Sequence, residues 1–433
     1  MAFSSLSSGT NTALTPLPAS ERLFGWRDHA ALWLSLGVGL LVMQIGAYLV
    51  PALGTQAALT VIVCGSVLGA GLLAWTAKIG CDSGLSSAGL MHATYGSSFA
   101  RLPVLFNIVQ LIGWTTFELV VMRDATVAIA RQSDGFTGTV WPVLTTLLWG
   151  AVLLALLSGS MVKLVRQIIG RYGLPLVIAS LLWLSWQFLS KANAQGLSAL
   201  WQRAGDGSMS TLAALDLVIA MPVSWLPLVA DFSRHGRSGN SALRGTWLGY
   251  ALANTWCYAL GLLVALTTPS TDLVAALLLA QGGLIALGLI LVDEVDNAYG
   301  DLYSGSVAGH SLKPGWSVRR WGMVLAVLST GLALVLPMHS LEPFLLMLSS
   351  VFVPLYGVIL ARLAGHANVV TLMTERRVNT SAVVIWLLGV ACYHLCAQLA
   401  PTWGAALPTL ILTFVLARFT RTLFNSSAIS SAV

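Results

Sequence analysis

Apolar segments of about twenty residues recur along the whole of this 433-residue chain. The hydrocarbon core of a bilayer is about 30 Å thick, so a helix needs roughly 20 apolar residues to cross it. Only 9% of the residues are charged, against about 25% in soluble domains. The chain is therefore expected to be an all-α polytopic membrane protein. About twelve transmembrane helices are predicted, at residues 30–50, 57–77, 102–130, 140–161, 167–189, 212–233, 244–268, 272–300, 318–337, 341–363, 380–399 and 402–421.

The positions of the basic residues test this count, because lysines and arginines gather in cytoplasmic loops. With the N-terminus inside, eighteen of the 22 lie in inside segments and Arg123 lies within the third span. The outside loops hold only Arg131, Lys191 and Arg203. A miscounted span would scramble this pattern. The distribution therefore supports a protein of the cell inner (cytoplasmic) membrane with both termini in the cytoplasm. It also explains the net charge of +6 by the basic cytoplasmic loops, so that no nucleic-acid binding is expected.

Carboxylates cluster at the end of the eighth predicted span. We expect the apolar run Leu273–Leu291 to continue as one helix through Gly305. On that helix one face is shared by Asp293, Asp296, Asn297, Gly300, Asp301 and Ser304. A carboxylate at membrane depth costs several kcal/mol, so it faces a bundle interior or a wet cavity and usually serves ion or substrate movement. The alternative is that the span ends near Val292 and the acids form a solvated loop.

The first and sixth spans carry residues that interrupt helices. Gln44 lies among glycines in the first, and Pro222 and Pro227 flank Ser224 and Trp225 in the sixth. In lipid the backbone groups freed by a proline must find partners in protein, water or ligand. Interrupted segments at corresponding places in two halves indicate the binding site of an inverted-repeat transporter. Two ordinary kinked helices are the alternative.

The third span carries a second polar stripe. One helical face is shared by Asn107, Gln110, Trp114, Phe117 and Glu118. It combines the aromatic plane of Trp114 with a hydrogen-bond acceptor, Glu118, one turn away.

Four motifs give the chain a resemblance to the nucleobase:cation symporter family of cytosine, hydantoin and hydroxymethylpyrimidine permeases. They are QLIGWTTFE at Gln110–Glu118, SWLPLVADFSR at Ser224–Arg234, NAYGDLYSGSV at Asn297–Val307 and VFVPLYGVILA at Val351–Ala361. The stretch DEVDNAYGDLYSG is most similar to the hydroxymethylpyrimidine (thiamine precursor) branch.

The resemblance implies a LeuT-type fold, with a five-plus-five inverted repeat and broken helices 1 and 6. The ten-helix core would occupy 26–363, with repeat one at about 30–189 and repeat two at about 212–363. Two additional transmembrane helices would follow at 364–421. Residues 1–25 are expected to be a disordered cytoplasmic tail and 422–433 a second cytoplasmic tail.

The resemblance also implies a substrate site. An aromatic ring would stack between Trp114 and Trp225. Glu118 takes a position that is often an amide in the family, and Asp301 aligns with the amide that pairs with the ring, with Asn297 one turn away. The full set of expected substrate-binding residues is Gln110, Trp114, Glu118, Ser224, Trp225, Asn297 and Asp301.

The coupling ion of the family is sodium, held between the break in span one and span eight. Here that implies carbonyls around Val38 and Leu41 with side chains near Val295 and Asp296, where the usual pair of hydroxyls is missing. Two alternatives follow. Asp296 binds Na⁺ directly with Val38 and Leu41, or an acid of the group Asp293, Asp296 and Asp301 carries H⁺. No other cofactor is expected.

These patterns predict a secondary active importer of a pyrimidine-type ring, most of all hydroxymethylpyrimidine, that works as a monomer in the lipid bilayer. Ionised carboxylates only accept hydrogen bonds, so they favour a ring rich in donors. A cytosine or other nucleobase permease is the alternative. A membrane enzyme is disfavoured, because HExxH, GxSxG and GxxxxGK[ST] motifs are absent from the sequence. A channel or a sensor is the remaining reading.

Overall fold

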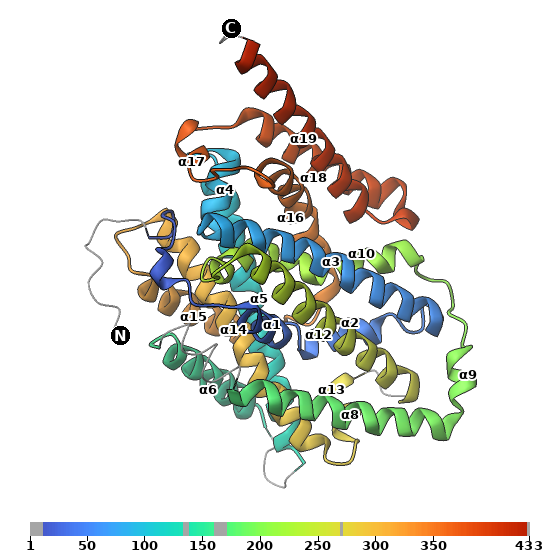
Figure 1. The fold of residues 1–433 in the computed structure, drawn as a ribbon. Coiled ribbons are helices and arrows are strands. Elements are labelled where there is room, and N and C mark those ends of the chain that lie inside the picture. Colours follow the sequence, from blue (N-terminus) through green and yellow to red (C-terminus); the bar gives the residue numbers. More distant parts are fainter. Residues whose placement is uncertain (1–11, 133–137, 160–170, 269–271, 431–433) are drawn as a thin grey trace.

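The computed structural model describes residues 12–132, 138–159, 171–268 and 272–430, with side chains described as far as residue 421. Its described elements are helices, which pack into one bundle (Figure 1). The N-terminal half contains α1 (Trp26–Ser35), α2 (Leu40–Tyr48), α3 (Thr55–Ser83), α4 (Ser87–Tyr95), α5 (Arg101–Ala130), α6 (Val140–Leu156), α8 (Leu174–Gln195) and α9 (Leu197–Trp201). The C-terminal half contains α10 (Thr211–Ser224), α11 (Leu226–Ser233), α12 (Gly239–Thr267), α13 (Leu273–Leu278), α14 (Gly283–Leu312), α15 (Val318–Val335), α16 (Leu341–Leu363), α17 (Leu372–Glu375), α18 (Thr380–Leu399) and α19 (Ala406–Ser430).

The described helices make this a multi-pass membrane protein. Eight are long and apolar enough to cross a bilayer, and the bent pair α1–α2 raises the number to nine. Two further helices are not among these nine. Helix α6 is too short, with 17 residues, and α14 carries four acids. Twelve spans therefore stay a prediction.

The first span is broken as predicted. Its halves α1 and α2 meet at 61°. In the sixth span α10 ends at Ser224 and α11 begins at Leu226, with Trp225 between them. The two parts still run on as one 23-residue segment, because Trp225 is bonded to both: its amide donates to the Pro222 carbonyl and its carbonyl accepts from the Val229 amide.

The eighth span differs from its prediction at its start. The helix is not continuous from Leu273, because α13 ends at Leu278 and Gly282, at φ 69°, turns the chain before α14 begins. In the sequence the adjacent glycines 282 and 283 are the signal for this turn, and Gly282 is the N-cap of α14. The acids lie well inside α14, with Asp293, Glu294 and Asp301 at most 5% exposed. The solvated-loop alternative is therefore excluded.

Helix α12 lies in backbone contact with both halves of the broken span. A Cβ at Gly261 would overlap the Met43 carbonyl of α2, and one at Gly46 would overlap the Tyr258 carbonyl of α12. Further along, a Cβ at Gly249 would overlap the Ala30 carbonyl of α1. Small residues allow helix backbones to approach this closely in membranes.

The two C-terminal helices α18 and α19 lie together at one end of the bundle (Figure 1). A buried carboxylate fixes one of them. Asp216 of α10 accepts hydrogen bonds from the backbone amides of Ala405 and Ala406, at the start of α19. An acid at a helix N-terminus satisfies amides that have no partner within the helix.

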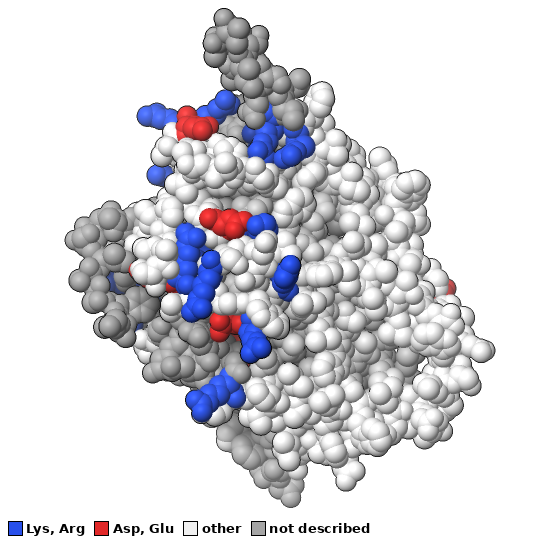
Figure 2. All heavy atoms as spheres, viewed as in Figure 1, with Lys and Arg blue, Asp and Glu red and all other residues white. Residues whose placement is uncertain are grey.

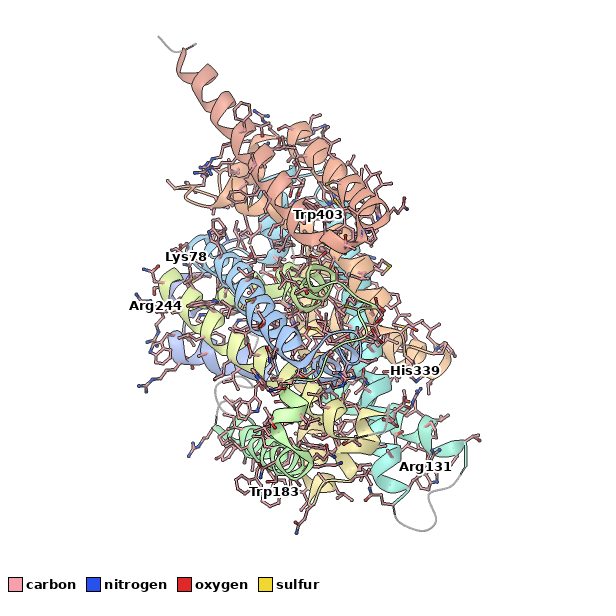
Figure 3. The ribbon with its side chains drawn as sticks, turned by 90° about the vertical axis from the view of Figure 1, so that its right-hand side faces the viewer. Lys78, Arg131, Trp183, Arg244, His339 and Trp403 are labelled. Carbon is pink, nitrogen blue, oxygen red and sulfur yellow. The ribbon has the colours of Figure 1, made fainter. Side chains whose placement is uncertain are left out.

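Charged residues divide between the two ends of the helices. Figure 3 shows Lys78 and Arg244 on one side of the molecule and Arg131 and His339 on the opposite side. Figure 2 shows arginines and lysines spread over one part of a mostly uncharged surface. Which of these sides lies inside the cell stays a prediction.

Gly261→Ala should destabilise the protein. Its new methyl group would displace the Met43 carbonyl, and overpacking of this kind typically costs about 1–3 kcal/mol. We expect a melting temperature several degrees lower for the purified protein. The matched control is Gly288→Ala in α14, where a Cβ meets no atom within 4 Å. Equal melting temperatures for the two variants would contradict the close contact.

Candidate substrate-binding site

A small cavity lies where the break between α1 and α2 meets α5, α10, α11 and α14. Its volume is about 20 Å³, which is room for about one water molecule. Its lining residues are Leu36, Gly39, Leu41, Val42, Trp114, Glu118, Met221, Ser224, Trp225, Leu228, Glu294, Asn297 and Asp301. A larger ligand requires its side chains to move apart.

Two tryptophans from different spans contribute to the wall. Trp114 of α5 and Trp225, between α10 and α11, are 6% and 9% exposed. Each is held by another aromatic side chain. Trp33 meets Trp225 edge-on, with ring centroids 5.9 Å apart, and Phe344 meets Trp114 at 5.1 Å. The cavity therefore has two indoles whose positions are fixed by packing.

The acidic face of α14 divides into two. Asn297 and Asp301, both expected to bind substrate, line the cavity together with Glu294. Asp293 is turned toward α1, where the Ser35 hydroxyl donates to its Oδ1 at 2.8 Å. Asp296 does not line the cavity either, and its Oδ2 has no hydrogen-bond partner in the described part of the chain.

Glu294 was missing from the predicted site. It is fully buried and accepts a hydrogen bond from the Leu40 amide, at the first residue of α2. A carboxylate there complements the positive end of the helix dipole. The sequence held a signal for it, since Glu294, Asn297 and Asp301 follow the helical spacing i, i+3 and i+7.

Glu118 of α5 and Glu294 of α14 both line the cavity, so each of these helices contributes a carboxyl group to its wall. Ionised carboxyl groups that share a buried space repel each other unless a cation lies with them. The cavity therefore favours a positively charged partner.

The expected sodium ligands are differently engaged. The Val38 carbonyl accepts a hydrogen bond from the Asn297 amide at 3.0 Å, and Leu41 lines the cavity. Val295 is buried and apolar, so its side chain offers no oxygen. A sodium site built on Val38, Leu41 and Asp296 would require Asn297 to release the Val38 carbonyl.

Gln110, also predicted to bind substrate, lies outside the cavity lining. Its Nε2 donates to Asn107 Oδ1 at 2.9 Å and to the Ser224 carbonyl at 3.3 Å. Asn107 in turn donates to the Pro227 carbonyl at 2.9 Å. These two amides satisfy carbonyls at the interruption of span six. Ser224 does line the cavity, with its hydroxyl bonded to the Met221 carbonyl.

Three polar atoms of the lining residues are buried and have no partner in the described protein. They are the indole Nε1 of Trp114, Oε2 of Glu118 and Oδ1 of Asn297. A buried polar group without a hydrogen bond costs about 1–3 kcal/mol. The arrangement therefore favours a small polar ligand that supplies these hydrogen bonds.

Comparison with known proteins matches residues 16–417 to a family described as permeases for cytosine/purines, uracil, thiamine and allantoin. The chain belongs to this permease family. The family resemblance inferred from the motifs is thereby confirmed, and the permease is a transporter and not an enzyme.

One curated relative is the purine-uracil permease NCS1 of Arabidopsis thaliana. It is 31% identical over 119 residues, which is 27% of this chain. The matched segment covers 20% of the relative's length.

Solved structures agree on the fold. MHP1, a nucleobase-cation-symport-1 family transporter with bromovinylhydantoin bound, has a TM-score of 0.82 at 16% identity and 96% coverage of both chains. A Na⁺-coupled sialic acid symporter scores 0.65 at 13% identity, covering 96% of this chain and 93% of the other. MhsT with L-phenylalanine scores 0.60 at 16% identity, covering 90% and 98%. The permease thus has the LeuT-type fold expected, an inverted five-plus-five repeat with spans one and six interrupted.

Asn107→Leu should destabilise the permease. The leucine is similar in size but can neither donate to the Pro227 carbonyl nor accept from Gln110, and losing these buried hydrogen bonds costs about 1–3 kcal/mol. A melting temperature several degrees lower is expected. The control is Asn193→Leu, whose side chain is exposed at the end of α8. If both variants have the melting temperature of the wild type, the side-chain amide of Asn107 does not stabilise span six.

Proposed function

We propose that this permease is a secondary active importer of a pyrimidine-type ring, foremost hydroxymethylpyrimidine, driven by a cation gradient through alternating access. The observation that carries the proposal is the cavity with Trp114 and Trp225 in its wall and unpartnered polar atoms on Trp114, Glu118 and Asn297. The permease acts as a monomer in the cytoplasmic membrane with both termini inside. Residues 26–363 form its transport core.

Stacking supplies the affinity for a flat ring. A nucleic-acid base stacked on an aromatic side chain gains about 1–3 kcal/mol, and a pyrimidine has a comparable face. Trp114 and Trp225 belong to opposite repeats of the fold, so a ring placed between them joins the two halves. The cavity has room for about one water molecule, which is too small for a pyrimidine ring. The two indoles must therefore move apart when the ring enters, and the ring then binds between them.

The edge of the cavity sets the preference among rings. Glu118, Glu294 and Asp301 are carboxyl groups, so the site is rich in acceptors. An aminopyrimidine offers an exocyclic amine, and its protonated ring nitrogen pairs with a carboxylate through a charge-assisted hydrogen bond. A dicarbonyl ring such as uracil offers fewer donors. Cytosine also carries an exocyclic amine, which makes a cytosine permease the second candidate.

Coupling follows from the same acids. Either Na⁺ binds at Asp296 with the Val38 and Leu41 carbonyls, or a proton neutralises a carboxyl group of α14. The hydrogen bond from Asn297 to Val38 favours the proton, because it occupies a carbonyl that sodium would need. Glu118 and Glu294, which both line the cavity, add a second place where such a proton can reside.

Trp114→Ala and Trp225→Ala should each abolish binding of hydroxymethylpyrimidine. Removing one indole removes half of the stack and opens the wall of the cavity. The measurement is the thermal shift of purified protein with hydroxymethylpyrimidine, cytosine and uracil, with and without Na⁺ at pH 6 and 8. Trp186→Ala, at a 66% exposed position on α8, is the control and should respond as the wild type. A normal shift in either cavity variant would remove the stacking role, and no wild-type response to any pyrimidine would overturn the substrate proposal.

Asp296→Asn and Glu294→Gln should separate the two coupling schemes in proteoliposomes. If Na⁺ binds at Asp296, the first variant loses sodium-driven accumulation of substrate while counterflow exchange continues. If the proton resides on the glutamate pair, Glu294→Gln loses accumulation driven by a pH gradient, and Asp296→Asn retains it. Asp206→Asn, at an exposed loop position, is the control. Unchanged ion dependence in both variants would exclude both residues from coupling.

A further inference from the structure

A second cavity lies away from the substrate site, where α4, α16, α17 and α19 meet. Its volume is about 130 Å³. Its lining residues are Ala93, Gly96, Arg362, His366, Leu372, Glu375, Arg376, Asn379, Ser381 and Arg421. Figure 2 shows basic side chains gathered over the end of the molecule where Figure 1 places α17 and α19. The predicted topology puts this end in the cytoplasm.

The lining carries an excess of positive charge. Arg362, Arg376 and Arg421 meet there with His366, and Glu375 is the one acid among the lining residues. The ion pairs found in the described part of the chain involve Lys78, Arg123 and His339, and none of these three arginines. Like charges brought together repel one another unless an anion lies between them.

Two of the arginines are held in place by the fold. Nη2 of Arg362 donates to the Ser381 hydroxyl at 2.7 Å, while its Nε is buried without a partner. Nη1 of Arg421 donates to the carbonyls of Arg362 and Ala364 at 2.8 and 3.0 Å, so it caps the end of α16. Fixed guanidinium groups lose little freedom when they bind an oxyanion.

The third arginine is placed by its backbone. The amide of Ser97 donates to the Arg376 carbonyl at 3.0 Å, and that of Ser98 to the Arg377 carbonyl at 2.9 Å. A Cβ at Gly96 would lie 2.7 Å from the Arg377 carbonyl, so glycine permits this close approach. The loop before α18 is thus docked on the end of α4, which keeps Arg376 at the cavity rim although its side chain is exposed.

We propose that this cavity binds a phosphate group, either on an anionic lipid headgroup or as a soluble phosphate ion. Arginine forks match the oxygens of phosphate, and basic pockets between membrane helices on the cytoplasmic side suit anionic headgroups. The side chains of Asn379 and Ser381 add neutral hydrogen-bonding groups at the wall. A water molecule takes about 30 Å³ of liquid, so a space of this size accommodates a tetrahedral anion.

The bound anion would join the C-terminal helices to the transport core. Helix α4 forms one wall of the cavity, and the amide of Ser87 at its start donates to Asp231 of α11 at 3.1 Å. Helix α11 is the second half of the interrupted sixth span. The phosphate site is therefore connected through one short helix to the span that carries Trp225.

The experiment uses the full chain, purified and delipidated in detergent. Melting temperature is measured against phosphatidylglycerol, phosphatidylcholine and inorganic phosphate, and native mass spectrometry counts retained lipid. We expect phosphatidylglycerol or inorganic phosphate to raise the melting temperature by about 5 °C near saturation. A response to phosphatidylglycerol alone identifies the lipid as the source, and an equal response to inorganic phosphate identifies the soluble ion.

Arg376→Gln is the main variant, because its side chain is exposed and the substitution leaves the backbone docking intact. It should weaken the apparent affinity at least about tenfold, the equivalent of one lost charge-assisted contact. Arg362→Gln is the second variant, and Arg319→Gln, an exposed arginine at the start of α15, is the control. The proposal is overturned if neither phosphate source shifts the wild type, if phosphatidylcholine acts as strongly as phosphatidylglycerol, or if Arg376→Gln and Arg362→Gln both respond as the control does.

Discussion

The break in the first span leaves backbone groups without helical partners in a place that lipid cannot hydrate. Helix α14 supplies those partners. Glu294 accepts from the Leu40 amide at the start of α2, and Asn297 donates to the Val38 carbonyl at the end of the break. These two side chains explain why a buried acidic helix lies beside an interrupted one. The same two residues line the cavity, so the groups that stabilise the break also form part of the cavity wall.

In the sixth span the backbone groups at the interruption are hydrogen-bonded by neutral side chains. Pro227 removes a donor, and the carbonyls of Ser224 and Pro227 are met by Gln110 and Asn107 from α5. Helix α5 therefore has two separate tasks along one face. Asn107 and Gln110 support the interruption, and Trp114 and Glu118, one and two turns after Gln110, line the cavity. The polar stripe seen in the sequence is thus partly a scaffold, and only its later members are placed to contact a ligand.

Much of this arrangement could be predicted from local patterns. The spans predicted at 341–363 and 380–399 coincide with α16 and α18, and the acids of α14 are helical and buried. Glu294 was missed because it lies at the edge of the predicted acidic face, and its importance depends on where α2 begins in space. Gln110 likewise could not be assigned from spacing, since its partner is the Ser224 carbonyl at the interruption of span six, more than a hundred residues away. Contacts between residues so far apart in the sequence depend on how the spans pack, which local patterns do not determine.

The glycine contacts of α12 have a mechanical consequence. Both halves of the broken span press their backbones against this one helix, α2 through Gly261 and α1 through Gly249. If either half slid along α12, carbonyl oxygens would have to pass a neighbouring backbone. At these glycines there is no side chain that could move aside. We therefore expect α1, α2 and α12 to move as one rigid unit. The backbone changes that open the permease toward one side or the other would then lie outside these three helices. We therefore expect the angle of 61° between α1 and α2 to be kept when the unit moves.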